Sequence, residues 1–233
     1  MIRQTQSSRN RIVLLYSLLF VLLLFLMPIS LQSSEFVQLD SPDTEAGYLA
    51  YLLINENPFP SEKGYESVED SKTGMVQILW VLNDRLRIIP KGYTQFQIAN
   101  TKTKSIVGVI TAKGQCEGFF LTDDGKPAFA ERVQKRITYL LKIANSGGKP
   151  GKFAELLNFA KNLSRTYVNF MKIFNPNIFQ NIFVINKTKV TGRAYSWMTD
   201  KDYYSPGGTF VAIPDSLGGS QGGNRFYTLK QKE

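Results

Sequence analysis

SVEDSKTGMVQILWVLNDRL, residues 67–86, is the stretch that decides the fold. Its apolar side chains recur at helical spacing and predict an amphipathic helix with one buried face. The stripe consists of Met75, Ile78, Leu79, Leu82 and Leu86. Three neighbours widen it: Val76, Trp80 and Val81. A stripe this wide is typical of a central, mostly buried helix. Ser67 suits the N-cap position, and Asp70 follows three residues later as in a capping box.

A second helix is expected just before this one. Ser41 suits its N-cap position, and Pro42 suits the first helical position, where the missing N–H is no loss. The helix should run through GYLAYLLINE and stop near Asn57-Pro58, because proline disfavours helical backbone in the residue before it.

The rest of the sequence predicts further helices, followed by a region of short strands. Residues 95–112 should be helical in part, and residues 113–127, with three glycines, should form a loop. Apolar stripes at 133–144 and 153–171 predict a helical hairpin. From residue 175 onward, short β-like runs alternate with glycine turns. We therefore expect a mainly α domain of the α+β class, with a small C-terminal β element.

Residues 12–31, IVLLYSLLFVLLLFLMPISL, form a run of twenty positions without charge. About twenty apolar residues span a bilayer as a helix. Three arginines precede the run, namely Arg3, Arg9 and Arg11, and the next basic residue is Lys63. This asymmetry predicts that the N-terminus lies in the cytoplasm. A cleaved signal peptide is the alternative, although no A-x-A-like site follows the run. In both interpretations, the rest of the chain lies outside the cytoplasm.

These features divide the chain into a cytoplasmic N-terminus (1–11), a single-pass helix in the cytoplasmic membrane (12–31), a connector (32–41) and a domain (42–233). The domain should lie in the periplasm or another extracytoplasmic space. Its front is acidic and its body basic: residues 71–233 hold twenty-four Lys plus Arg against ten Asp plus Glu. Such a body could attract anionic envelope polymers or lipid headgroups, although solvated surface charge is the simpler explanation. Nucleic acid is disfavoured as a partner, because no recognition motif is present.

The composition excludes several kinds of chemistry. The chain has no histidine, which removes Ser-His-Asp and Cys-His catalysis and histidine-bound zinc. Its single cysteine, Cys116, cannot form an intrachain disulfide and has no nearby base in the sequence, so we expect it to be inert or partly buried. Acid–base chemistry must fall mainly to Asp, Glu, Lys or Tyr. We expect no metal site and no cofactor.

Glu56 is the first candidate for such chemistry. It lies at the C-terminal end of a mostly apolar helix, where the negative end of the helix dipole and partial burial both favour the neutral form of a carboxylic acid. A general acid for glycosidic cleavage has to hold its proton near neutral pH. An acid at a helix end is more often a solvated surface residue, so the position alone decides little.

Several short blocks give this position a context. Asn55-Glu56 is followed by a polar loop that contains Gly64, GMV at 74–76 opens the next helix, and VLNDRL at 81–86 closes it. Further along come Pro90, Val109-Ile110, Gln115 and the block GNRFY at 223–227. In this order of blocks, the chain resembles the cell wall hydrolase family typified by spore-cortex-lytic enzymes. Those are lysozyme-like peptidoglycan glycosidases, and several are lytic transglycosylases.

The resemblance implies a lysozyme-like fold, with Glu56 as the catalytic acid. It also implies a glycan cleft near the C-terminal block, where aromatic side chains can stack on sugar rings. The substrate-binding residues expected are Gln115, Tyr195, Trp197, Asn224, Phe226 and Tyr227. For the aromatic residues, ordinary core packing is the alternative.

The chain departs from the family pattern in several ways. The loop after Glu56 is longer than in the family, and Cys116-Glu117-Gly118 separates Gln115 from Phe119. Arg225 stands near the place of the family's C-terminal histidine, and Asp84 stands where asparagine is frequent. The stretch near 128–190, which includes the helical hairpin, looks like an insertion.

Other polar residues are weaker candidates than Glu56. Glu66, Glu69 and Asp70 could supply a second carboxylate, but capping of the next helix explains them better. Arg193 and Arg225 could bind a peptide-stem carboxylate, although surface arginine is the usual case.

The sequence therefore predicts a membrane-anchored enzyme that cleaves the glycan strand of peptidoglycan, a lytic transglycosylase or else a hydrolase. An inactive relative that binds glycan or scaffolds an envelope protein complex is the first alternative. An unrelated envelope assembly protein is the second.

Overall fold

The computed structural model describes residues 36–147, 151–169 and 182–232. The chain divides into two units, Met1–Glu35 and Phe36–Glu233, and the described residues all belong to the second. The predicted membrane helix, residues 12–31, lies outside the described residues. Among the helices of the described ranges, none is both long enough and apolar enough to cross a bilayer.

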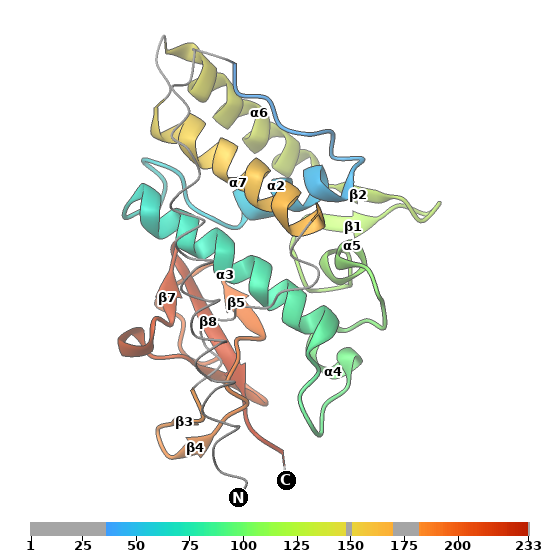
Figure 1. Cartoon of the computed structure of the whole chain (residues 1–233), viewed down its shortest axis with the longest axis vertical. Helices are drawn as coiled ribbons and strands as arrows, with labels where there is room; N and C mark the ends of the chain where they lie inside the picture. Colours follow the sequence, from blue (N-terminus) through green and yellow to red (C-terminus); the bar gives the residue numbers. More distant parts are fainter. Residues whose placement is uncertain (1–35, 148–150, 170–181, 233) are drawn as a thin grey trace, which may run out of the picture. The chain divides into compact units, whose positions relative to one another are not determined.

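The domain mixes helix and strand (Figure 1). Its α-helices within the described ranges are α2 (Glu45–Asn55), α3 (Val68–Arg87), α4 (Gln95–Ala99), α5 (Ile106–Ile110), α6 (Glu131–Ser146) and α7 (Lys152–Asn169). The strands there are β1 (Phe119–Leu121), β2 (Pro127–Phe129), β3 (Val184–Ile185), β4 (Thr188–Lys189), β5 (Ser196–Met198), β6 (Phe210–Ala212), β7 (Ser220–Gln221) and β8 (Asn224–Leu229). One 3-10 turn, η2 (Asp215–Leu217), precedes β7.

The predicted central helix is confirmed as α3. Ser67 is its N-cap, and its hydroxyl accepts a hydrogen bond from the backbone N–H of Asp70 at 3.0 Å. The predicted stripe is buried from Met75 to Leu82, and Trp80 is only 2% exposed. Helices α2, α6 and α7 lie on one side of α3, and the strands of the C-terminal third lie on the other (Figure 1). Both layers bury apolar side chains against this one helix.

The start of α2 differs from the prediction. The helix begins at Glu45, and Thr44, not Ser41, is its N-cap, with the Thr44 hydroxyl accepting from the backbone N–H of Gly47 at 3.0 Å. Ser41 lies in a turn before the helix, and its carbonyl accepts the Thr44 N–H. A Cβ on Gly47 would collide with that carbonyl, so the close turn requires glycine there. The helix ends at Asn55, in agreement with the predicted stop.

The predicted loop at 113–127 contains a strand that the sequence reading missed. Phe119–Leu121 pairs antiparallel with Pro127–Phe129, and a turn through Gly125, at φ +76°, connects them. Neither strand alternates apolar and polar residues, so the usual strand signal is missing. Residues 95–112 are helical in part, as predicted, in the short helices α4 and α5.

The predicted helical hairpin is confirmed as α6 and α7. Helix α7 packs against α2 and α3 as well as against α6, and its apolar face is buried. Residues Ala154, Leu156, Leu157, Ala160 and Leu163 form this face. The hairpin therefore completes the core of the domain.

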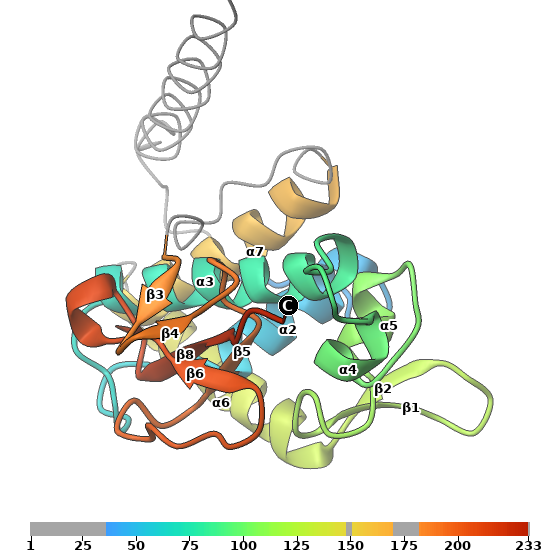
Figure 2. The same cartoon turned by 90° about the horizontal axis from the view of Figure 1, so that it is seen from below.

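The predicted C-terminal β element is a small antiparallel sheet in the order β5-β8-β6, with β7 also paired to β8. Trp197 of β5 lies opposite Phe226 of β8. The β7–β8 turn uses Gly222 and Gly223, both with positive φ, as a tight two-residue hairpin requires. Seen from below, β8 lies between β5 and β6, and the β3–β4 hairpin stands beside this sheet (Figure 2).

Candidate functional site

Glu56 caps the C-terminus of α2, and its backbone N–H donates to the Leu52 carbonyl at 2.9 Å. Its side chain is 8% exposed. The oxygen Oε2 accepts two hydrogen bonds from the far end of the chain: Trp197 Nε1 donates at 3.0 Å and Thr199 Oγ1 at 3.1 Å. The other oxygen, Oε1, lies 3.4 Å from Asn55 Nδ2. Strand β5 and the residue after it thus fix one carboxylate oxygen of a residue on α2.

This geometry decides where Glu56 would hold a proton. An indole N–H can only donate, so Oε2 is an acceptor toward Trp197. If the Thr199 hydroxyl also donates to Oε2, a protonated Glu56 carries its proton on Oε1, the oxygen whose contact with Asn55 is longer and weaker. Donation and recovery of a proton at Oε1 would leave the two bonds at Oε2 in place.

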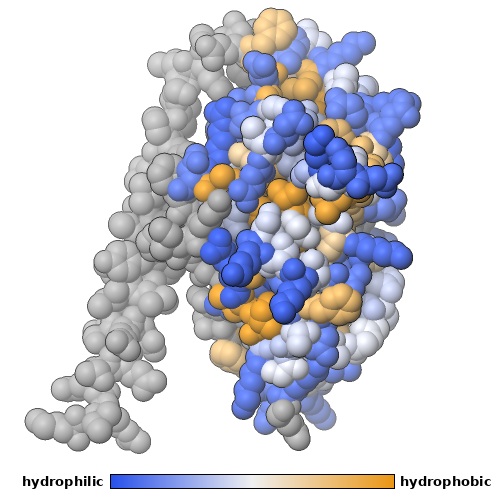
Figure 3. Space-filling view, turned by 90° about the vertical axis from the view of Figure 1, so that its right-hand side faces the viewer, coloured by the Kyte–Doolittle hydropathy of each residue, from blue (hydrophilic) through white to orange (hydrophobic). Residues whose placement is uncertain are grey.

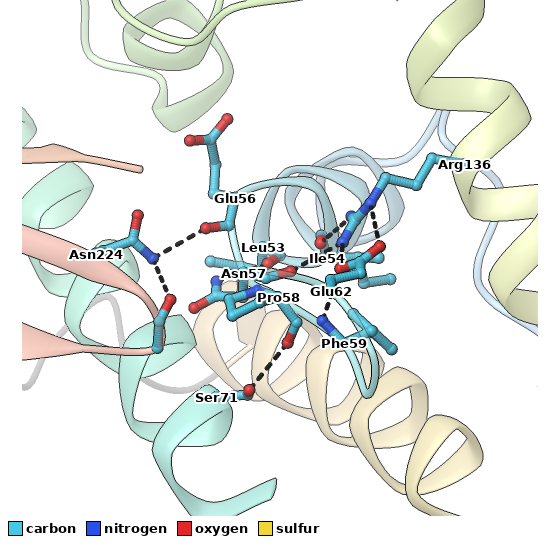
Figure 4. A network of polar contacts seen from close by, with 11 residues as sticks. Leu53, Ile54, Glu56, Asn57, Pro58, Phe59, Glu62, Ser71, Arg136 and Asn224 are labelled. Carbon is cyan, nitrogen blue, oxygen red and sulfur yellow. Dashed lines mark hydrogen bonds and ion pairs between the residues drawn. The ribbon is translucent and has the colours of Figure 1, made fainter. Parts of the chain in front are cut away.

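Asn224 holds the backbone of Glu56 from the other side. Its side-chain Nδ2 donates to the Glu56 carbonyl at 2.9 Å and to the Gly222 carbonyl at 2.7 Å. Figure 4 shows this link, with Asn224 at the start of β8 facing the end of α2 and the Glu56 carboxylate pointing away from the network below it. Asn57 adds a bond from its Nδ2 to the Leu53 carbonyl at 2.7 Å. The amides of Asn57 and Asn224 thus fix the position of Glu56.

Four glycines, which have no side chain, allow three chain segments near Glu56 to pack closely against one another. A Cβ on Gly74 of α3 would lie 2.8 Å from the Gly222 Cα and would collide with Asn57 Oδ1. A Cβ on Gly64, in the loop after α2, would lie 3.3 Å from the Gly223 Cα. We call Gly64, Gly74, Gly222 and Gly223 the glycine junction. It joins the loop after Glu56, the helix α3 and the β7–β8 turn. These three segments carry sequence blocks in which the chain resembles the cell wall hydrolases.

Arg136 of α6 binds the end of α2, a role that the sequence analysis missed. Its guanidinium donates to the Ile54 carbonyl at 2.5 Å and to the Asn57 carbonyl at 3.0 Å, and it pairs with Glu62 (Figure 4). A cation at a helix C-terminus binds the free carbonyls and offsets their partial negative charge. Arg136 lies far along the chain from α2, and no spacing rule connects the two.

A buried cluster lies behind Trp197. The Arg85 guanidinium lies 5.0 Å from the Trp197 ring centroid, and Arg85 Nε donates to the Tyr195 carbonyl at 2.7 Å. Burial lowers the pKa of Arg85 to about 10, so it stays charged at neutral pH. Burial, together with the charge of Glu56, raises the pKa of the Cys116 thiol. Cys116 is buried, in agreement with the sequence analysis, and its raised pKa favours the thiol over the reactive thiolate.

The predicted substrate-binding residues separate into two groups. Trp197 contacts the Glu56 carboxylate, and Asn224 holds its backbone. Gln115 lies in the loop after α5, where its backbone N–H donates to the Ala112 carbonyl at 3.0 Å. The others are buried side chains, and two donate to backbone carbonyls: Tyr195 to Ile88 at 2.8 Å, and Tyr227 to Tyr203 at 2.5 Å. These bonds and their burial fit core packing better than stacking on a sugar.

Phe226 has the same burial, with no exposed surface in this structure. Burial raises the pKa values of both tyrosines, that of Tyr227 to about 12, so both hydroxyls remain neutral donors. The glycan contacts predicted for Tyr195, Phe226 and Tyr227 stay predictions, and in this structure the three residues support the strands that carry Trp197 and Asn224.

The other acidic candidates, Glu66, Glu69 and Asp70, have different surroundings. Glu66 pairs with Lys201, and Glu69 is exposed on α3. The pKa of Asp70 is raised, mainly by burial and also by the nearby Glu66. A hydrogen bond from the Gly222 N–H opposes this rise. Within the described ranges, His, Cys, Asp and Glu form no cluster that could hold a metal ion.

Arg225 is buried, and the usual surface role does not apply to it. Its guanidinium donates to the carbonyls of Lys201 and Ile213, pairs with Asp215, and lies over the Tyr204 ring at 3.9 Å. It ties the loop after β5 to the turn before β7. Arg193 lies 3.4 Å from the buried carboxylate of Asp84. This ion pair explains why α3 has an aspartate here, where the family often has asparagine.

Comparison of the chain with protein-family models, curated proteins and solved structures finds no match.

Proposed function

We propose that the domain is a peptidoglycan glycosidase, a lytic transglycosylase with Glu56 as its single general acid and base. The observation that carries the proposal is the fixing of Oε2 by Trp197 and Thr199, which leaves Oε1 to exchange a proton. The resemblance of residues 45–119 and 223–227 to cell wall hydrolases supports it, because the glycine junction brings these blocks together around Glu56.

The mechanism needs one carboxyl group in two protonation states. Glu56 Oε1 first donates its proton to the glycosidic oxygen, and the bond to the anomeric carbon breaks. The ionised Glu56 then accepts the proton of the sugar's 6-hydroxyl, whose oxygen attacks the anomeric carbon. The product is a 1,6-anhydro ring, and no water is added. Trp197 and Thr199 hold the carboxyl group in position through both steps by donating to Oε2.

A second carboxylate is not required for this route. The hydrogen bonds found at the Glu56 carboxyl come from Asn55, Trp197 and Thr199, and none of these residues is acidic. A hydrolase would need a second carboxylate to activate water or to form a covalent intermediate. We favour the transglycosylase because its route needs only the one acid that Trp197 and Thr199 hold in place, and a lysozyme-like arrangement of the helices around Glu56 is part of the same proposal.

The substrate class implies a place in the cell. We propose a single-pass protein of the cytoplasmic membrane with its N-terminus inside and its domain facing the glycan strands. The charge asymmetry around residues 12–31 supports this topology. A reporter that is active only outside the cytoplasm, fused after Glu233, should be active, and a cytoplasmic reporter at that place should be silent.

A non-catalytic role is the second candidate, as a glycan-binding or scaffold protein of an envelope complex. The low exposure of Glu56, 8%, favours it, because a carboxylate that ties α2 to β5 also has a purely structural use. In that case the carboxyl is a structural hydrogen-bond acceptor and donates no proton.

A zymogram on cell-wall substrate separates the two candidates. Glu56→Gln keeps an oxygen that accepts from Trp197 and Thr199 but removes the acid. The matched control is Glu66→Gln, which removes a carboxylate from the exposed pair with Lys201. Lysis by the unmodified chain and by Glu66→Gln, with none by Glu56→Gln, supports catalysis. Equal lysis by all three removes Glu56 from the mechanism, and lysis by none leaves the scaffold role.

A further inference from the structure

A pocket of about 390 Å³ opens at the C-terminal end of α3. It lies at the end of the domain that carries the β3–β4 hairpin, which faces the viewer in Figure 2. Part of its lining is apolar, from Ile88, Phe183 and Val190. Another part is cationic, from Lys91, Arg193 and Lys232. The pocket thus offers both an apolar wall and positive charge to one ligand.

The segments around this pocket carry charge of one sign. Residues 88–93, 182–193 and 230–232 contain six Lys plus Arg and no Asp or Glu. The buried Asp84 faces Arg193 from α3, and it accounts for one of the six. Five lysines remain at this end of the domain, and their field favours an anionic surface.

The β3–β4 hairpin adds exposed apolar side chains beside these lysines. Phe183 is 60% exposed and Val184 is 57% exposed. Val184 lies opposite Lys189 across the hairpin, so these two side chains share one face, while Phe183 lines the pocket on the other. Apolar side chains surrounded by lysines are the pattern of a surface that enters the headgroup region of a bilayer.

This end of the domain is built as one unit. The Gln231 N–H donates to the Lys189 carbonyl at 2.9 Å, which attaches β4 to the C-terminal segment. The Tyr93 hydroxyl donates to the Lys230 carbonyl at 2.8 Å, and the Lys232 ammonium lies 3.9 Å from the Tyr93 ring centroid. These contacts hold the loop after α3, the hairpin and the C-terminal segment together, so their charges act jointly.

We propose that this end of the domain docks on a bilayer of anionic phospholipid. Lys91 and Lys232 bind the phosphates of the headgroups, and Phe183 and Val184 enter the boundary between headgroups and acyl chains. The proposal does not depend on the glycosidase activity. Charge and apolar surface together favour a lipid surface over a soluble polyanion, which would gain nothing from Phe183.

The test uses the full chain in nanodiscs and a fluorescent probe on the hairpin. Val184→Cys is labelled with the environment-sensitive dye NBD, and the only other thiol, Cys116, is buried. The nanodiscs contain phosphatidylcholine alone or phosphatidylcholine with phosphatidylglycerol. Docking predicts a blue shift and a rise in NBD emission only when phosphatidylglycerol is present.

Charge reversals show whether the response belongs to this site. Lys91→Glu with Lys232→Glu should abolish the shift, because each cation near an anionic bilayer contributes about fivefold in binding. The matched control is Lys142→Glu with Lys152→Glu, on the exposed surface of the α6–α7 hairpin. It changes the net charge equally and should keep the shift.

Three results would overturn the proposal. The first is equal emission in both kinds of nanodisc, and the second is an equal loss in both charge-reversed variants, which indicates general attraction. The third is release by inorganic phosphate at an ionic strength where chloride has no effect, which indicates a site for the free anion.

Discussion

The Glu56 carboxylate and the Trp197 indole meet at 3.0 Å, although 141 residues separate them in the sequence. One lies at the end of a helix and the other on a strand of the C-terminal sheet. The contact connects the helical layer to the sheet and fixes the position of the Glu56 Oε2 atom. The position of the acid therefore depends on strand β5 as much as on helix α2.

Thr199 is predicted to position the acid. Thr199→Val removes the hydroxyl that donates to Glu56 Oε2 but keeps the side-chain shape. We expect kcat on cell-wall substrate to fall on the order of tenfold, because the carboxyl loses one of its two orienting bonds. The free energy of unfolding should fall by only about 1 kcal/mol.

Thr199→Ser is the control, because it restores the hydroxyl and should restore kcat. Steady-state turnover and urea denaturation measure the two quantities. An unchanged kcat in Thr199→Val would show that this bond has no part in the reaction.

The glycine junction is predicted to tolerate no side chain at Gly74. Gly74→Ala places a methyl group against Asn57 Oδ1 and the Gly222 Cα, and we expect it to cost about 1–3 kcal/mol of unfolding free energy. Gly151→Ala is the matched control, because nothing lies within 4 Å of a Cβ there. Thermal denaturation of the two variants measures the difference. Equal melting temperatures would refute the close approach of α3 and the β7–β8 turn.

Asp70 makes stability depend on pH. Burial raises its pKa, so the folded chain keeps a proton that the unfolded chain has already lost. The stability contributed by this group is present at low pH and is lost as pH rises through the folded pKa. Asp70→Asn removes this dependence, so its stability relative to the unmodified chain should rise between about pH 3 and pH 7.

Asp40→Asn should show the opposite sign. The hydrogen bond from Arg165 lowers the pKa of Asp40, so the unmodified chain gains stability as pH rises and the variant does not. Urea denaturation across this pH range measures both variants. The same trend in both would contradict the burial assigned to Asp70.

Local sequence signals predicted the elements around the site. The stripe from Met75 to Leu82, with the cap at Ser67, specifies α3 through spacing alone. Pro58 marks the end of α2, and this places Glu56 at a helix terminus. These features follow from neighbouring residues, which is why the sequence reveals them.

The contacts that complete the site are not local. Nothing near Glu56 in the sequence indicates Trp197, Asn224 or Arg136 as its partners, because strand pairing and helix packing bring them together. The role of the aromatic residues near Tyr195 is likewise not predictable from the sequence alone. Core packing and glycan stacking both use aromatic residues, and only the fold shows that the Tyr195 side chain is buried.

The face of the domain away from the β3–β4 hairpin offers no second docking surface of this kind among the exposed apolar residues named below. On the face at the right-hand side of Figure 1, apolar patches lie apart from one another among polar side chains (Figure 3). The exposed large apolar residues of the domain include Phe96, Phe120 and Leu121. Single apolar residues of this kind are normal on a protein surface.

The masses of the products from purified peptidoglycan test the central claim most directly. The digest uses the full chain, Glu56→Gln and the control Glu66→Gln. We predict muropeptides that end in 1,6-anhydro rings, lighter by one water than hydrolysis products, from the unmodified chain and the control. Loss of the acid should slow release by about 10²–10⁴-fold in Glu56→Gln. Products with an added water would assign the two-carboxylate mechanism instead, and full activity of Glu56→Gln would contradict the role of Glu56.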